Sequence, residues 1–379
     1  MPGCATGWGR SSQLKKARTL KVPCVSCDPI GILVATLSGL LLIGGWVFRR
    51  DPDAWLHEFG KRETLPLRGL LVSFVVLGHM DSMTGREYAL LGAFHWATPA
   101  VAVFFFMSGY GLWKGFQSAE RTGRTAAYWK SFVVCSPVKL FFPVVILGLI
   151  LLLCRCLTGN VAGVRDLVRV VTGKALHNTW FVRTLLLFYM FYFASFVTLG
   201  GRRGMGAVLF GVLGYWIFLK YGCESRHFQR VSCFAFPIGL VFASVENRIR
   251  LIVSRRPILV SLILSLALAV IYGLRVPKEI LYMFLGPIVA TILYFGNGLM
   301  KVAALNCLGR YSYEIYLVHG IFQYGFRELP WSPLVYIGMV VGVTVIVAVP
   351  LHLVDVKING WLRAGIDGMS PKIPEQRPN

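Results

Sequence analysis

Charge is scarce in this sequence, and negative charge is scarcest. Only 15% of the 379 residues are charged, and 17 Asp and Glu stand against 39 Lys and Arg, whereas about 25% of a soluble domain is charged. In place of polar sequence, apolar runs recur along the chain, and hydrophobic residues make up 56% of it. These runs approach the roughly 20 residues that a helix needs to cross a bilayer. The composition excludes an ordinary soluble domain and indicates a polytopic membrane protein.

Sequence signals for metal or cofactor chemistry are missing too. The chain has no Gly-rich phosphate loop and no cluster of metal-ligand residues, so we expect no metal and no permanently bound cofactor. Cys24 and Cys27 form the one CxxC among nine cysteines. A single CxxC without a second pair or a nearby histidine is a weak metal signal. We interpret this pair as incidental, with reversible lipidation as the alternative.

The basic residues, which give a formal net charge of +22, gather in short clusters between the apolar runs. Examples are residues 48–50, 201–203 and 254–256. One explanation is a nucleic-acid partner, and the other is loop charge that sets topology and contacts anionic lipid headgroups. Because the clusters separate apolar runs, we favour the second explanation, with membrane lipids as partners and no nucleic acid.

The apolar runs are unbroken rather than alternating. This pattern predicts helices, because lipid leaves only helices and closed barrels with a satisfied backbone. We expect an all-α bundle of ten core transmembrane helices. The expected core spans lie near residues 65–83, 89–113, 131–153, 180–199, 204–221, 232–246, 257–274, 279–299, 311–326 and 332–352.

The core has flanking segments on both sides. The expected organisation is a basic, disordered N-terminal arm at 1–29, an extra hydrophobic helix at 30–48, a linker at 49–64, the membrane core at 65–352 and a polar C-terminal tail at 353–379. A cleaved signal peptide is the alternative for 30–48, but no clear small-residue cleavage site follows it.

Loop charges give a partial orientation. The positive-inside rule favours a cytoplasmic position for the C-terminal tail and for the loops at 115–130, 200–203, 247–256 and 300–310. The linker then faces the cytoplasm as well, and a spanning helix at 30–48 would place the basic arm outside, against the same rule. Either the arm is exported or that helix does not span fully.

The apolar segment "LPLRGLLVSFVVLGHM" carries Arg68 and His79. Their separation is close to three helical turns, so both side chains lie on one face about 16 Å apart. Arg68 could snorkel at a helix end while His79 makes one interhelical hydrogen bond. Alternatively, the shared face lines a polar cavity, because ionisable groups are costly against lipid. Histidine also suits proton transfer near neutral pH.

Three further stretches place polar groups in apolar helices. In "FFFMSGYGLWKGF", glycines flank Ser108 and Tyr110, which permits either a helix break or close helix packing. "HNTWFVRTLLLFYM" opens a span with His177, Trp180 and Arg183, where an interfacial aromatic belt is the alternative to a site.

The third of these stretches is "LGRYSYEIYLVHG". Ser312, Tyr316 and His319 fall on one helical face, at spacings that bring side chains together, whereas Glu314 points elsewhere. A second intramembrane histidine beside hydroxyl groups again indicates a polar cavity.

These segments together resemble the acyltransferase-3 family of integral membrane O-acyltransferases. The matching stretches are "LRGLLVSFVVLGH", "VFFFMSGYGL", "WFVRTLLLFY" and "LGRYSYEIYLVH". The resemblance implies a ten-helix bundle and a multi-pass protein, which we expect in a bacterial inner (plasma) membrane. It also implies transfer of an acyl group, often acetyl, from cytoplasmic acyl-CoA to a hydroxyl of a saccharide or another cell-surface acceptor.

The resemblance assigns roles to individual residues. Arg68 and His79 match the two catalytic positions of the first core helix. The family's donor-binding motif usually has two arginines three residues apart; this chain departs from it and offers Lys130 and Lys139 instead. The residues expected to contact substrates are Ser108, Tyr110, Trp180, Glu314, Tyr316 and His319.

In the expected mechanism, His79 is the general base for the acceptor hydroxyl, and Arg68 neutralises donor phosphate or the developing oxyanion. A covalent acyl-histidine is a variant of this mechanism. Two other function classes compete. A transporter or flippase for a glycan or lipid-linked substrate would use the same polar face as a path. A scaffold subunit would need neither Arg68 nor His79 for activity.

Overall fold

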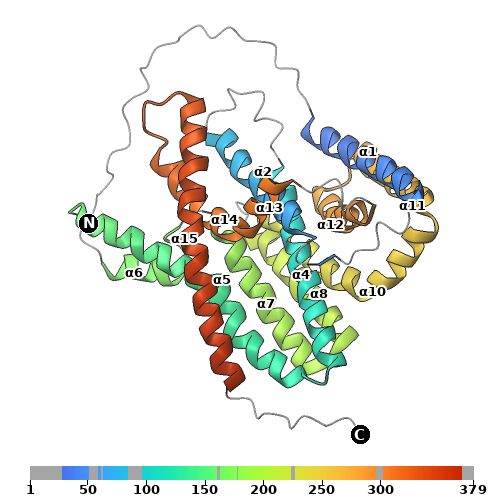
Figure 1. Cartoon of the computed structure of the whole chain (residues 1–379), viewed down its shortest axis with the longest axis horizontal. Coiled ribbons are helices and arrows are strands. Elements are labelled where there is room, and N and C mark those ends of the chain that lie inside the picture. Colours follow the sequence, from blue (N-terminus) through green and yellow to red (C-terminus); the bar gives the residue numbers. More distant parts are fainter. Residues whose placement is uncertain are drawn as a thin grey trace.

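The computed structural model describes residues 28–50, 59–60, 63–83, 96–159, 163–176, 178–222, 227–295 and 302–368. These described residues form helices joined by short connections, without a strand (Figure 1). The expectation of an all-α fold is therefore confirmed for this part of the chain.

Within the described residues, each of the ten expected core spans corresponds to one helix, and four more helices accompany them. The helices are α1 (Pro29–Arg50), α2 (Leu65–Met83), α4 (Ala97–Arg121), α5 (Thr125–Leu157), α6 (Val164–Val171), α7 (Trp180–Leu199), α8 (Gly201–Gly222), α9 (His227–Ser232), α10 (Ala235–Arg255), α11 (Pro257–Gly273), α12 (Lys278–Phe295), α13 (Ala303–Arg310), α14 (Ser312–Gly325) and α15 (Pro333–Gly368).

Among the described residues, seven segments are long and apolar enough to cross a membrane, and two shorter apolar helices lie in α2 and α11. The helices α4 and α14, which carry several expected site residues, belong to neither group, and α14 has only 14 residues. The protein is thus a multi-pass membrane protein, whereas the count of ten core spans stays a prediction.

Several helix boundaries differ from expectation. The span expected at 89–113 is α4, which begins at Ala97 and continues to Arg121, while residues 89–95 lie outside the described part. The polar tail expected from 353 onward is helical as far as Gly368. The polar residues of this segment indicated a solvated tail. In the structure Asp355 and Asn359 are buried one turn apart and continue the inward face of α15.

The helix ends can be assigned to faces of the bundle from their contacts. α1 runs antiparallel to α11, since Gly31 lies against Tyr272 and Gly45 against Ser261. α4 and α10 run parallel, since Gly109 lies against Phe236 and, further along both helices, Lys114 pairs with Glu246.

The ends of α1, α4 and α10 therefore share one face, which we call the basic face. Its exposed arginines are Arg121, Arg124, Arg202, Arg203, Arg255 and Arg256. The α7–α8 turn belongs there because Phe196, near the end of α7, packs on Trp113 and Phe116 of α4. The positive-inside rule predicts that this face is cytoplasmic.

α1 follows α11 along its whole length, at the edge of the bundle opposite α15 (Figure 1). Asp28 marks its other end, where Tyr272 donates a hydrogen bond of 2.5 Å to the Asp28 carboxylate. This arrangement favours a spanning α1 over one that stops within the bilayer. The basic arm before residue 28 lies outside the described residues.

The glycines of the second stretch permit close packing and do not break the helix. α4 is continuous through Ser108 and Tyr110, so the break that we considered there is wrong. A Cβ atom at Gly109 would overlap the Phe236 carbonyl, and one at Gly239 would overlap the Phe106 carbonyl. The two backbones therefore meet directly, as small residues allow in membrane helices.

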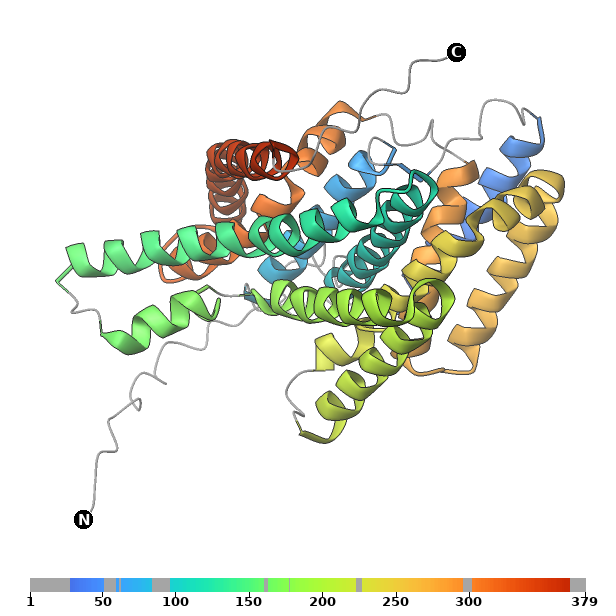
Figure 2. The same cartoon turned by 90° about the horizontal axis from the view of Figure 1, so that it is seen from below.

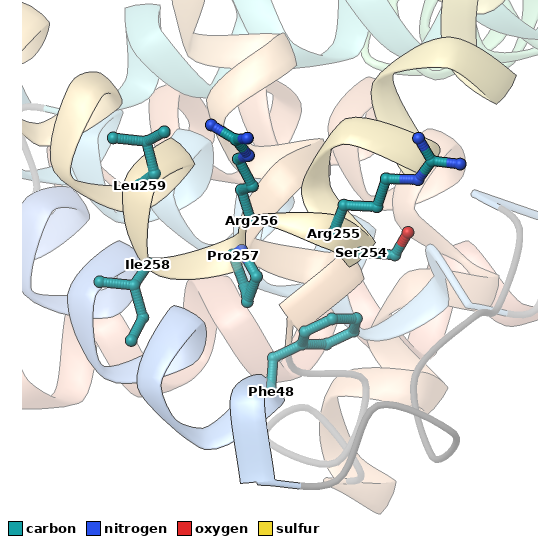
Figure 3. A pocket seen from close by; sticks show the side chains of 7 residues that line it. All are labelled: Phe48, Ser254, Arg255, Arg256, Pro257, Ile258 and Leu259. Atoms are coloured by element: carbon teal, nitrogen blue, oxygen red, sulfur yellow. The ribbon is translucent and has the colours of Figure 1, made fainter.

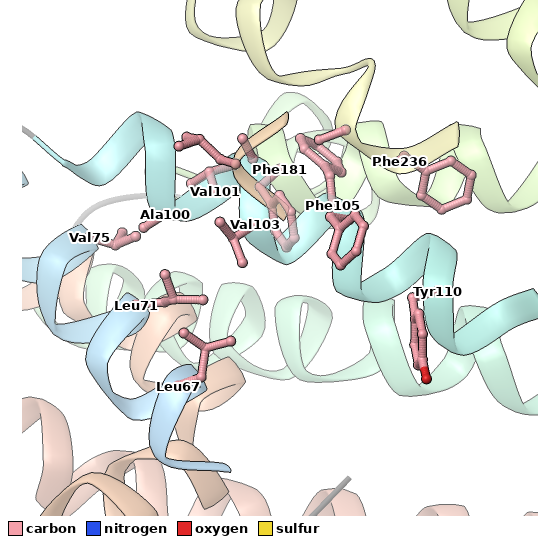
Figure 4. Packing of buried hydrophobic residues seen from close by; sticks show 14 of the residues in the cluster. Leu67, Leu71, Val75, Ala100, Val101, Val103, Phe105, Tyr110, Phe181 and Phe236 are labelled. Atoms are coloured by element: carbon pink, nitrogen blue, oxygen red, sulfur yellow. The ribbon is translucent and has the colours of Figure 1, made fainter. Parts of the chain in front are cut away.

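The core lies where α2, α4, α7 and α10 meet. Apolar residues such as Leu71, Phe105 and Phe236 fill this space (Figure 4). In the view from below, α5 and α6 extend beyond the other helices at one edge of the bundle (Figure 2). The outer surface is apolar as well, with Phe210 74% and Leu334 77% exposed, as expected where lipid replaces water.

Candidate active site

The helices α2 and α14 bring two histidines together inside the bundle. The ring centroids of His79 and His319 lie 5.4 Å apart at an interplanar angle of 32°. His319 is fully buried, whereas His79 is partly exposed. Near them, the Gln323 amide donates to the Val76 carbonyl over 3.0 Å and fixes α14 against α2.

Both ring nitrogens of His319 are engaged. Nδ1 lies 2.5 Å from the Tyr316 carbonyl, and Nε2 lies 3.4 Å from the Asn178 side-chain nitrogen. A carbonyl oxygen only accepts, so Nδ1 carries the proton and Nε2 accepts from the Asn178 amide. These contacts hold the ring neutral and in one orientation.

Asn178, in the segment before α7, contacts both His319 and Tyr316. Its carbonyl accepts a hydrogen bond from the Tyr316 hydroxyl, and its φ of 64° is a left-handed conformation that asparagine tolerates better than most residues. We name Asn178, His79, Tyr316 and His319 the histidine cluster. Sequence analysis did not single out Asn178, and its only signal was an asparagine just before a helix start.

The residues around Asn178 have different positions. His177 lies outside the described residues. The Arg183 charge acts on Tyr316, so Arg183 lies beside the histidine cluster. Trp180 packs against Phe105, at 6.4 Å between ring centroids, and against Phe181, whose ring lies 5.4 Å from that of Tyr316.

Arg68 belongs to a second polar group, nearer the basic face. The guanidinium is partly buried and interacts with Tyr189 of α7. Ser108 lies within hydrogen-bonding reach of the same tyrosine, and its hydroxyl also donates to the Phe104 carbonyl over 2.9 Å. Sequence analysis missed Tyr189, which links Arg68 to Ser108.

Tyr110 does not join either group. Its hydroxyl donates to Glu246 over 2.8 Å, and the same carboxylate accepts from Tyr294 over 2.7 Å and pairs with Lys114 at 2.5 Å. Ser108 and Tyr110 are two residues apart, so they point to nearly opposite sides of the helix. The structure thus does not bring Tyr110 together with Ser108.

Glu314 also has a different partner. Its carboxylate lies 2.8 Å from Nδ1 of His352 on α15, and its side chain is buried. The contact directs Glu314 away from Tyr316 and His319, as the helical spacing indicates, and joins α14 to α15. The structure thus does not bring Glu314 into the histidine cluster.

Lys130 and Lys139 are both exposed on α5. Nine residues of helix separate them by about 13 Å, so they do not form a single clamp. Lys139 interacts with the Asp355 carboxylate. No group of three or more His, Cys, Asp or Glu residues within the described ranges could hold a metal ion.

The bundle therefore contains two polar groups at different depths, which we call the two polar levels. The first is the group around Arg68, and the second is the histidine cluster. Arg68 lies on the first level and His79 about 16 Å further along α2. A long substrate that enters from the basic face could present charge to the first level and a reacting group to the second.

Comparison with known proteins places this bundle in a family. The model of an acyltransferase domain, that of the acyltransferase-3 family, matches residues 67–353, from α2 to most of α15. Neither the curated proteins nor the solved structures contain a match to the chain. The matched region includes both polar levels and leaves α1 outside. The chain belongs to the acyltransferase-3 family and is a membrane acyltransferase.

Proposed function

We propose that this enzyme transfers an acyl group, with acetyl the expected one, from acyl-CoA to a hydroxyl of a saccharide or another cell-surface acceptor in a bacterial plasma membrane. Family membership supports acyl transfer in general. The observation that carries the choice of catalytic base is the pairing of a partly exposed His79 with a His319 whose two nitrogens are engaged.

In the proposed reaction, His79 accepts the proton of the acceptor hydroxyl while that oxygen attacks the thioester carbonyl. The new C–O bond forms, the tetrahedral intermediate collapses, and the C–S bond breaks. The proton held by His79 then passes to the departing thiolate. General base catalysis of this kind contributes about 10²- to 10⁴-fold to the rate.

His319 is a positioning residue in this scheme. Its Nδ1 proton and its Nε2 lone pair already have partners in Tyr316 and Asn178. A ring held in this way limits the space in which the neighbouring His79 ring can move. The histidine cluster thus presents one base in a defined orientation.

Arg68 interacts with the acyl-CoA donor in this scheme. Its position nearer the basic face suits either the phosphates of coenzyme A or the oxyanion that forms on the thioester carbonyl. Lys130 and Lys139 add diffuse attraction for the nucleotide, because lysines act as point charges and not as a fixed fork.

The test uses purified protein in detergent with acetyl-CoA and a saccharide acceptor, and follows release of free thiol. His79→Gln should lower kcat by about 10²- to 10⁴-fold, while elution and thermal unfolding stay unchanged. His227→Gln is the matched control, since His227 is exposed on α9. Normal turnover in His79→Gln would remove the assignment of the base.

The same assay separates the competing functions. A transporter needs no coenzyme A, so acyl-CoA binding or acceptor-dependent thiol release favours the enzyme over a transporter. A scaffold would tolerate both Arg68→Gln and His79→Gln. A covalent acyl-His79 would appear as an added acyl mass when acyl-CoA is supplied without acceptor. Mass spectrometry of surface glycans, with and without the protein, would identify the acceptor by a lost acyl mass.

A further inference from the structure

A cavity of about 350 Å³ lies away from both polar levels, at the basic face, where the end of α1 meets the α10–α11 turn (Figure 3). The residues that line it are Phe48, Ser254, Arg255, Arg256, Pro257, Ile258 and Leu259. Phe48 comes from α1, and the other residues come from the end of α10 and the start of α11.

The charged residues that line this cavity are both arginines. Arg255 and Arg256 are both exposed, and the lining residues that the structure describes include no carboxylate. The two arginines are neighbours in the chain, and their guanidinium groups point in different directions (Figure 3). Two positive charges at one cavity favour an anion, and the planar fork of each matches phosphate oxygens. The Ser254 side chain also lies at the cavity wall, with its hydroxyl donating to the Leu251 carbonyl over 3.0 Å.

The surface beyond the cavity is apolar. The outward residues of the first turns of α11 are 45 to 66% exposed. They are Leu259, Leu262, Ile263 and Leu266. The ligand that fits both parts therefore has a phosphate at one end and hydrocarbon at the other.

We propose that this cavity binds the phosphate headgroup of an anionic phospholipid, with its acyl chains along α11. Basic pockets between membrane helices bind anionic headgroups, and the apolar surface of α11 favours a lipid over a soluble phosphate compound. Because Phe48 forms one wall, the site requires α1, which lies outside the matched family region. The bound lipid joins this extra helix to the acyltransferase domain.

The test is native mass spectrometry of the full chain, purified in a neutral detergent and supplied with phosphatidylglycerol or phosphatidylcholine. The wild type should retain phosphatidylglycerol and not phosphatidylcholine. The double variant R255Q/R256Q should bind phosphatidylglycerol about thirtyfold more weakly, since each arginine contact contributes about fivefold.

The double variant R202Q/R203Q is the matched control. Arg202 and Arg203 are also adjacent, exposed and on the basic face, but they do not line the cavity. An equal loss of lipid in both double variants would mean that general charge attracts the lipid, and would overturn the proposal. R255K/R256K keeps the charge and should retain part of the binding, which guards against misfolding as the cause.

A second arm distinguishes lipid from the phosphates of coenzyme A. Coenzyme A is titrated against the lipid-bound protein. If coenzyme A displaces the lipid, and R255Q/R256Q weakens coenzyme A binding, the cavity holds the donor nucleotide and the lipid proposal is wrong. Retention of the lipid at saturating coenzyme A supports it.

Discussion

The ring of His79 lies 5.4 Å from the ring of His319, although the two residues come from opposite ends of the family domain. Two imidazolium rings at this distance would repel each other strongly in a buried setting. The pair therefore carries at most one positive charge, and the contacts that keep the His319 ring neutral leave that charge to His79.

Asn178→Gly should lower kcat about tenfold and leave the KM for acyl-CoA unchanged, because the variant removes the amide that holds Nε2 of His319. Glycine keeps the left-handed backbone, so stability should change little. Arg275→Gly is the control, since Arg275 also has a left-handed φ, of 51°, but lies outside the cluster. Equal kcat values in the two variants would argue against a positioning role for His319.

Arg68→Gln should lower kcat/KM for acyl-CoA by about 10²-fold, the usual effect of removing one charge-stabilising donor. If Arg68 binds donor phosphate, the KM for acyl-CoA rises; if it stabilises the oxyanion, kcat falls. The KM for the acceptor should stay constant in both cases. Arg310→Gln, an exposed arginine at the end of α13, should behave as wild type.

Glu246→Ala should lower the free energy of unfolding by about 3 kcal/mol, because it leaves the partners of a buried carboxylate unpaired. Tyr110→Phe removes one of these hydrogen bonds and should cost about 1 kcal/mol. Thermal unfolding in detergent measures both, with exposed Glu120→Ala as the neutral control. Unchanged kcat in Tyr110→Phe would support the placement of Tyr110 outside the active site, and a large loss of kcat would contradict it.

Gly109→Ala should destabilise the protein by about 1–3 kcal/mol, as overpacking usually does, because its Cβ would overlap the Phe236 carbonyl. Gly111→Ala, two residues on, meets no atom within 4 Å and should be neutral or slightly stabilising. The difference between their midpoints of thermal unfolding measures the α4–α10 contact. Similar midpoints would mean that the helices can separate at no cost.

Helical periodicity was sufficient to predict the positions of the helices and the shared face of Tyr316 and His319. The sequence could not predict Asn178, because it meets His319 only after the whole bundle has folded. It also could not identify the partner of Tyr110. The expected span ended at Glu246, whereas three donors stabilise this buried carboxylate and α10 continues to Arg255.

The C-terminal boundary was missed for a related reason. Polar residues after 352 resemble a solvated tail, yet His352 and Asp355 lie on the inward side of a continuous helix, and Asn359 donates to the Asp355 carboxylate over 2.9 Å. Hydropathy alone does not distinguish a polar residue in water from one with a partner inside a bundle.

α1 places the start and the end of the described chain at opposite ends of the bundle. Its antiparallel packing on α11 puts Asp28 opposite the basic face. The contact between His352 and Glu314, near the start of α14, directs the end of α15 toward the basic face. A single partner that contacts both ends must therefore extend across the full height of the bundle.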